Sequence, residues 1–175
     1  MLSALTPSFP VRAGLLMLPV VGFLLALVQP KVAQAWDSGA FSSTAERTLI
    51  ALTEDTREAA GVDPLNVDAA LSSVARWRSR DMVERGYFSH DIPDVGNVFR
   101  RLDANGYCYE LAGENIGWDT DADAAAPEAI HEMFLASSGH RRTILKARWE
   151  AIGVGAYKAS DGRKMWTVLF ADRCG

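Results

Sequence analysis

The sequence predicts a single α+β domain in which helices cover both faces of a small, mostly antiparallel sheet. Helix start and stop signals occupy most of the chain, and a hairpin pattern ends it. The last strand of that hairpin, Met165 to Ala171, is a nearly continuous apolar run, which is typical of a strand buried on both faces. We find no internal repeat, no low-complexity tract and no second domain among the 175 residues.

The first helix is predicted from Ser43 to a stop at Gly61. Ser43 and Glu46 have the spacing of a capping box, in which two side chains satisfy free backbone N–H groups at a helix start, and glycine is a common helix stop. The other helices are expected from Asn66 or Asp68 to Gly86, from Val98 to Ala104, from Pro127 through Phe134, and from near His140 through Leu145.

Three further segments are predicted between and after the helices. Alternation over residues 107–111 indicates a strand or extended stretch before Gly113. The acidic, alanine-rich residues 119–126 predict a solvated loop. Residues 152–156 and 165–171, joined by a Ser-Asp-Gly turn, predict the hairpin.

The first 35 residues predict a secretory signal peptide. Arg12 precedes an apolar run over residues 13–28. Ala33 and Ala35 are small residues at the two positions that signal peptidase recognises before its cleavage site. The alternative is an uncleaved anchor, but the run is shorter than the roughly 20 residues that span a bilayer. The expected division is a signal peptide at 1–35, an N-terminal extension at 36–42 and a domain at 43–175. We expect a secreted or periplasmic monomer with no membrane span after cleavage.

Charge excludes one class of partner. Residues 1–35 contain two of the 18 basic residues and none of the 22 acidic ones. Residues 36–175 therefore have 16 basic and 22 acidic residues, a net charge of −6. Affinity for nucleic-acid backbones comes largely from lysine and arginine. Nucleic acid is therefore not an expected partner, whereas an acidic surface favours divalent cations.

The two cysteines, Cys108 and Cys174, both lie in the exported part. In an oxidising compartment such a pair is most simply one disulfide, which stabilises a fold by about 2–4 kcal/mol. Two free thiols are the alternative. No C-x-x-C spacing indicates redox or zinc chemistry.

Two of the three histidines are candidates for a site. His90 follows a helix stop and His140 lies at a helix start, places that binding residues commonly occupy. The helix dipole should keep His140 neutral, the form that binds metals. Glu114 lies between them, so two imidazoles and one carboxylate are candidates to hold a zinc-type ion with an open position for water. His131 lies mid-helix and is interpreted as a surface histidine.

The same residues have two other interpretations. Glu114 could act as a base on a metal-bound water. Alternatively, both histidines could bond backbone atoms at helix ends while Glu114 caps a turn, because their spacing matches no local metal motif.

Five segments in register resemble the superfamily of cysteine-rich secretory, antigen 5 and pathogenesis-related proteins (the CAP or SCP domain), in its short bacterial branch. They are residues 61–65 (GVDPL), 87–90 (YFSH), 111–116 (LAGENI), 137–145 (SSGHRRTIL) and 152–155 (IGVG). The resemblance covers about residues 43–170. It implies a three-layer α-β-α sandwich with an open central cavity and divalent-metal binding.

Carried over residue by residue, the resemblance places His90, His140 and Glu114 around the cavity, with Asn115 beside them. The family's second glutamate falls at Ser137, which cannot supply the charge. We therefore expect a binding module for a metal such as zinc and for a lipid, sterol or cell-envelope ligand. The alternative is a metal-dependent hydrolase, a protease or esterase that uses a metal-bound water.

Overall fold

The structure is a computed structural model that describes residues 35–172 and Cys174. Apart from Ala35, the predicted signal peptide lies outside the described residues. The described helices and strands, in chain order, are α1 (Ser43–Ala59), β1 (Asn66–Val67), α2 (Ala69–Glu84), α3 (Val98–Ala104), β2 (Ala112–Asp119), α4 (Ala126–Ala136), α5 (Ser138–Ile144), β3 (Ala151–Lys158) and β4 (Lys164–Ala171). Within these residues no helix combines the length and apolar character needed to cross a membrane.

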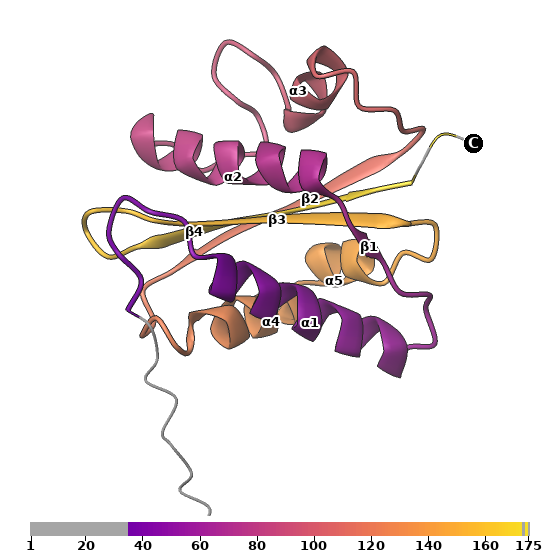
Figure 1. The fold of residues 1–175 in the computed structure, drawn as a ribbon, viewed down its shortest axis with the longest axis horizontal. Coiled ribbons are helices and arrows are strands. Elements are labelled where there is room, and N and C mark those ends of the chain that lie inside the picture. The colour runs from indigo at the N-terminus through magenta and orange to yellow at the C-terminus, as the bar shows by residue number, and fades with distance from the viewer. Residues whose placement is uncertain (1–34, 173, 175) are drawn as a thin grey trace, which may run out of the picture. The chain divides into compact units, whose positions relative to one another are not determined.

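The sheet has the strand order β1-β3-β4-β2 and lies between two layers of helices. β1 pairs with β3 in parallel, and the other two pairings are antiparallel. Figure 1 shows α2 and α3 on one face of the sheet and α1, α4 and α5 on the other. The predicted α+β class and the three-layer α-β-α sandwich are both confirmed.

Each face of the sheet packs against its own apolar core. Alternate residues of the predicted hairpin, including Val168 and Phe170, join the core under α1 and α4. Their neighbours Leu169 and Ala171 join the core under α2 and α3. All residues of β4 are buried, which explains why its sequence is apolar without alternation.

Two glycines let α2 lie directly on β3. A Cβ atom on Gly153 would be 2.3 Å from the Leu71 carbonyl carbon, and one on Gly155 would be 2.3 Å from the same atom of Ala75. Ser79, one turn after Ala75, donates a hydrogen bond of 2.9 Å to the Gly155 carbonyl. These two glycines therefore serve the close approach of helix to strand.

Most helix ends match the predictions. Asp68 caps α2 by accepting hydrogen bonds from two backbone N–H groups, and Gly61 and Gly86 have the positive φ expected after helix ends. The capping box at α1 is wrong. Ser42 is the cap, and the Glu46 carboxylate instead accepts hydrogen bonds from Arg76 and from the Ala156 N–H group.

Of the two forms predicted before Gly113, a strand or an extended stretch, the strand is wrong, because β2 begins only at Ala112. Residues 107–111 form no strand; the tyrosines there pack against the core under α2 and α3. β2 occupies 112–119 instead. The two-residue β1 was not predicted, because so short a segment has no readable pattern.

The acidic segment after β2 is not simply a solvated loop. Asp119 is 8% exposed and accepts a hydrogen bond of 2.5 Å from the Trp166 indole N–H group. Asp123 accepts from Lys158 at 2.9 Å, and Lys164 lies 3.4 Å from the same carboxylate. The buried Lys164 lies 3.8 Å from Asp119 as well, so it and the partly buried Lys158 offset the charge of both acids.

The predicted disulfide between Cys108 and Cys174 is present. Asp172, two residues before Cys174, accepts hydrogen bonds from the backbone N–H groups of Glu110 and Leu111 and from Arg148. Burial alone would raise the pKa of Asp172, but these donors outweigh it and lower that pKa. The chain end is thus fastened to the segment that leads into β2.

Candidate functional site

Glu114 stands at the centre of the candidate site. It is on β2 opposite Leu169 of β4, so its side chain is on the α2 face of the sheet. The side chain is only 4% exposed. One carboxylate oxygen lies 2.6 Å from Nδ1 of His90, and the other accepts a hydrogen bond of 3.1 Å from Nε of Arg78. Both oxygens are therefore engaged.

Arg78 connects α2 to the loop that carries His90. Its side chain is fully buried. One guanidinium nitrogen donates to the Tyr87 hydroxyl at 2.5 Å and another donates to the Ser89 carbonyl. The Tyr87 hydroxyl donates in turn to Asp81. Burial is the main cause that raises the pKa of Tyr87 to about 12, and the hydrogen bond to Asp81 is the second cause. One buried cation thus fixes both the carboxylate and the backbone beside His90.

His140 belongs to the opposite layer. Asn115 follows Glu114 on β2 and is on the other face of the sheet, where its amide nitrogen donates to the His140 carbonyl at 3.1 Å. Ser137 caps α5 by accepting a hydrogen bond from the His140 N–H group. The Phe134 ring packs edge-on against the imidazole at 5.0 Å between centroids. Backbone and ring contacts therefore position His140.

The two histidines are near enough to influence each other electrostatically. Burial lowers the pKa of His140, and the positive charge of His90 lowers it further. The hydrogen bond to Glu114 raises the pKa of His90. The pKa values of the two imidazoles are thus shifted in opposite directions, with burial as the main cause for His140 and the Glu114 hydrogen bond as the main cause for His90.

The two imidazoles are the side chains that could serve as donors for a metal ion. Glu114 holds His90 through Nδ1, as carboxylates behind metal-binding histidines do, and Nε2 is the nitrogen left for an ion. Nδ1 of His140 and the Asn115 side-chain oxygen are buried without a hydrogen-bond partner. Among the described residues, no group of three or more His, Cys, Asp or Glu side chains forms a ready ligand set. His90 and His140 are therefore the two residues that could hold an ion here.

No other carboxylate among the described residues replaces the glutamate that is missing at Ser137. Glu128 and Glu132 are exposed on α4, and Glu110, two residues before β2, pairs with Arg148. Ser137 itself serves as a helix cap. The described site is therefore built on one acid.

The surface assignment of His131 is wrong. This residue is 6% exposed in the interface between α1 and α4, and its Nε2 atom lies 2.8 Å from the Thr56 hydroxyl. That hydroxyl already donates to the Leu52 carbonyl, so His131 acts as the donor. A histidine beside a charged neighbour in sequence can still face the core.

Sequence reasoning missed Arg78. Its signal was present, because Arg78 continues the buried stripe of Leu71, Val74 and Ala75 toward Met82. A charged residue within an apolar stripe needs buried hydrogen-bond partners. For Arg78 these partners are the residues of the site, Glu114, Tyr87 and Ser89.

Fold and site together define a CAP-type α-β-α sandwich with a histidine pair at the edge of its sheet. The sequence profile of the CAP family, described as the cysteine-rich secretory protein family, matches residues 50–170. The chain belongs to this family.

Relatives include the Bacillus subtilis protein YkwD, which is 34% identical over 128 residues, 73% of this chain and 47% of YkwD. A crystal structure of an extracellular SCP-domain protein from Bacillus anthracis matches with a TM-score of 0.65 and 30% identity, over 74% of this chain and 41% of that one. An outer surface protein from Borrelia burgdorferi matches with a TM-score of 0.70 and 17% identity, over 78% of this chain and 99% of that one. The chain thus spans less than half the length of its Bacillus relatives.

Proposed function

We propose that this protein is a secreted binding module in which His90 and His140 hold a divalent metal ion such as zinc. The proposal includes a lipid, sterol or cell-envelope ligand bound beside this ion. The observation that carries the proposal is the bond from Glu114 to Nδ1 of His90, because it orients an imidazole that is 57% exposed. The extracellular relative from Bacillus anthracis supports the location.

Binding is favoured over hydrolysis by the state of Glu114. A general base needs a free oxygen within reach of the attacking water. Both oxygens of Glu114 are bonded, one to a buried arginine and one to His90. Ser137 stands where the resemblance places the family's second glutamate, so a second carboxylate is missing at that position.

Calorimetric titration with Zn²⁺ tests the metal site. We expect one ion per chain, with loss of uptake in the double variant His90→Ala/His140→Ala. Glu114→Gln should weaken binding about 10- to 100-fold, the usual effect of removing a carboxylate behind a ligating histidine.

The control is His131→Gln, which alters the third histidine but keeps a donor for Thr56. Its zinc uptake should equal that of the wild type. Absent uptake, or uptake that survives the double substitution, would contradict the proposal.

A further inference from the structure

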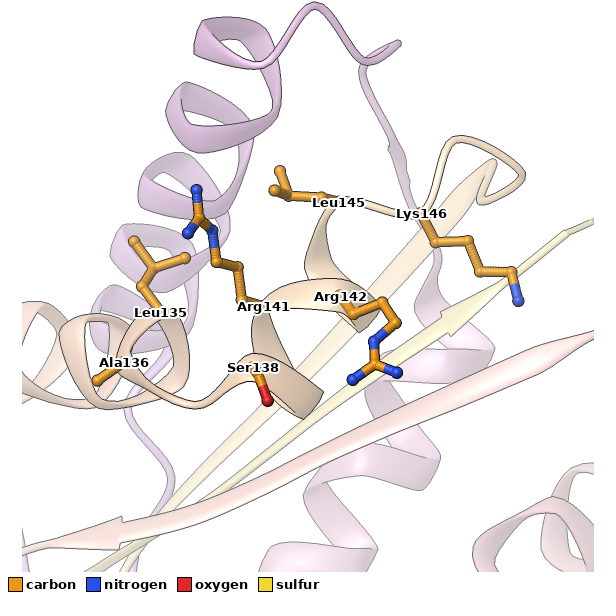
Figure 2. A pocket seen from close by; sticks show the side chains of 7 residues that line it. All are labelled: Leu135, Ala136, Ser138, Arg141, Arg142, Leu145 and Lys146. Atoms are coloured by element: carbon orange, nitrogen blue, oxygen red, sulfur yellow. The ribbon is translucent and has the colours of Figure 1, made fainter.

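A hollow of about 670 Å³ lies along the outer face of α5. Its apolar lining includes Leu135 and Leu145, and its polar lining includes Arg141, Arg142 and Lys146. Figure 2 shows Arg141 projecting next to Leu135, whereas Arg142 and Lys146 project away from it. The hollow is within the 300–1,000 Å³ range of small-molecule sites.

The apolar end of this hollow continues toward α1. A neighbouring hollow of about 430 Å³ shares Leu135, Arg141 and Leu145 with the first and adds Thr56, Ala59 and Ala60 near the end of α1. Together they form one groove, which we call the α5 groove. Arg142 and Lys146 lie at one end, Ala59 and Ala60 lie at the other, and Arg141 borders both hollows.

The cations of the α5 groove have no acidic partner within the described residues. No carboxylate there lies within ion-pair distance of Arg141, Arg142 or Lys146. Lys146 makes a cation–π contact with Trp149. Three uncompensated cations on a chain with an acidic excess are a local reversal of charge.

Capping of α5 does not account for these cations. Basic side chains near a helix C-terminus often satisfy its last carbonyls. Here the buried Arg57 already donates to the Ile144 and Lys146 carbonyls, at 2.7 and 3.1 Å. Arg141 and Arg142 therefore remain available to a ligand.

We propose that the α5 groove binds a single-chain amphiphile with a phosphate monoester head. Arg142 and Lys146 contact the head, and the chain lies over Leu145 and Leu135 toward α1. The stem of Arg141 covers the chain, since long basic side chains pack their methylenes on apolar surface. A doubly charged phosphate matches several cations better than a carboxylate does, and arginine binds phosphate through paired hydrogen bonds.

A membrane surface is a poorer match for the same residues. Each basic residue near an anionic bilayer contributes about 1 kcal/mol, so three of them hold a protein only loosely. A groove of this size instead predicts saturable binding to monomeric amphiphile.

The test is titration of the protein with dodecyl phosphate below its critical micelle concentration, followed by calorimetry. We expect one molecule per chain and a loss of about tenfold in affinity for Arg142→Gln and for Lys146→Gln, since each removes a charge-assisted contact. Leu145→Asn should weaken binding through the chain. Arg47→Gln, at an exposed arginine of α1, is the matched control and should bind as the wild type does.

Three other probes separate the chemistries. Three probes should each bind about tenfold more weakly than dodecyl phosphate. Inorganic phosphate lacks the alkyl chain, dodecyl maltoside lacks the negative charge, and laurate lacks the second negative charge of the phosphate. Equal binding of any one of them would overturn the corresponding part of the proposal. Unchanged affinity in both charge variants, or binding to anionic vesicles alone, would overturn all of it.

The amphiphile site rests on the proposed function only in treating the protein as a ligand-binding module. The two sites are distinguishable, because the variant His90→Ala/His140→Ala should lose zinc and keep dodecyl phosphate. Arg142→Gln should bind zinc as the wild type does and bind dodecyl phosphate more weakly.

Discussion

Replacing Arg57 by methionine should destabilise the fold through hydrogen bonds rather than through volume. Arg57, in the last turn of α1, is fully buried. Its guanidinium donates twice to the Asp63 carbonyl and once each to the Ile144 and Lys146 carbonyls. Methionine fills most of the same space but leaves three carbonyls without these donors.

The expected cost is about 3–4 kcal/mol. Each buried acceptor left unsatisfied costs about 1–3 kcal/mol, and part of the sum is returned because the guanidinium no longer has to be desolvated. That desolvation is the main reason that the pKa of Arg57 is lowered. For a domain of about 140 residues, a loss of this size lowers Tm by roughly 10–14 °C.

Thermal and urea unfolding of Arg57→Met and Arg57→Ala would measure the effect. The two variants should be similar if lost hydrogen bonds dominate, with alanine slightly worse because of its cavity. A methionine variant within about 1 kcal/mol of the wild type would refute the reasoning and assign the role of Arg57 to packing.

Three other perturbations have definite expected outcomes. Gly155→Ala should cost about 1–3 kcal/mol in urea unfolding, because α2 must move by roughly 1 Å from a strand that it touches; an unchanged midpoint would contradict that contact. Burial lowers the pKa of His131, so between that pKa and about 6.5 the unfolded chain binds a proton that the folded one does not. The stability of the wild type should therefore fall as pH drops through this window, and the fall should be smaller in His131→Gln; equal pH slopes would exclude this cause. Removing the disulfide with Cys174→Ala should cost about 2–4 kcal/mol of stability. Alkylation of Cys108 in the unreduced wild-type protein would show that the bond does not form.

Elements whose signals are local could be predicted from the sequence. Asp68, Gly61 and Gly86 determine helix ends by bonds and φ values within a few residues. The hairpin was readable because β4 is buried on both sides. The capping box failed because Glu46, although correctly spaced, is used by Arg76 from another helix.

β2 could not be read because packing and the site override its pattern. A Cβ atom on Gly113 would be 2.9 Å from Trp149, and one on Gly117 would be 2.6 Å from Ile130. Glu114 and Asn115, which the site uses, lie between these glycines. The strand that carries the chemistry thus looks like a loop in sequence, while the contacts of Arg78 depend on residues up to 36 positions away.

The strand order has a consequence for how this domain is made. β4 comes after every other described strand in the chain, yet it separates β3 from β2 and is the pairing partner of β2 along its whole described length. A growing chain has no template on which to align Glu114 until residues 164–171 have been synthesised. Assembly of the histidine pair is therefore a late event in the synthesis of this domain, because it waits for the last strand of the sheet.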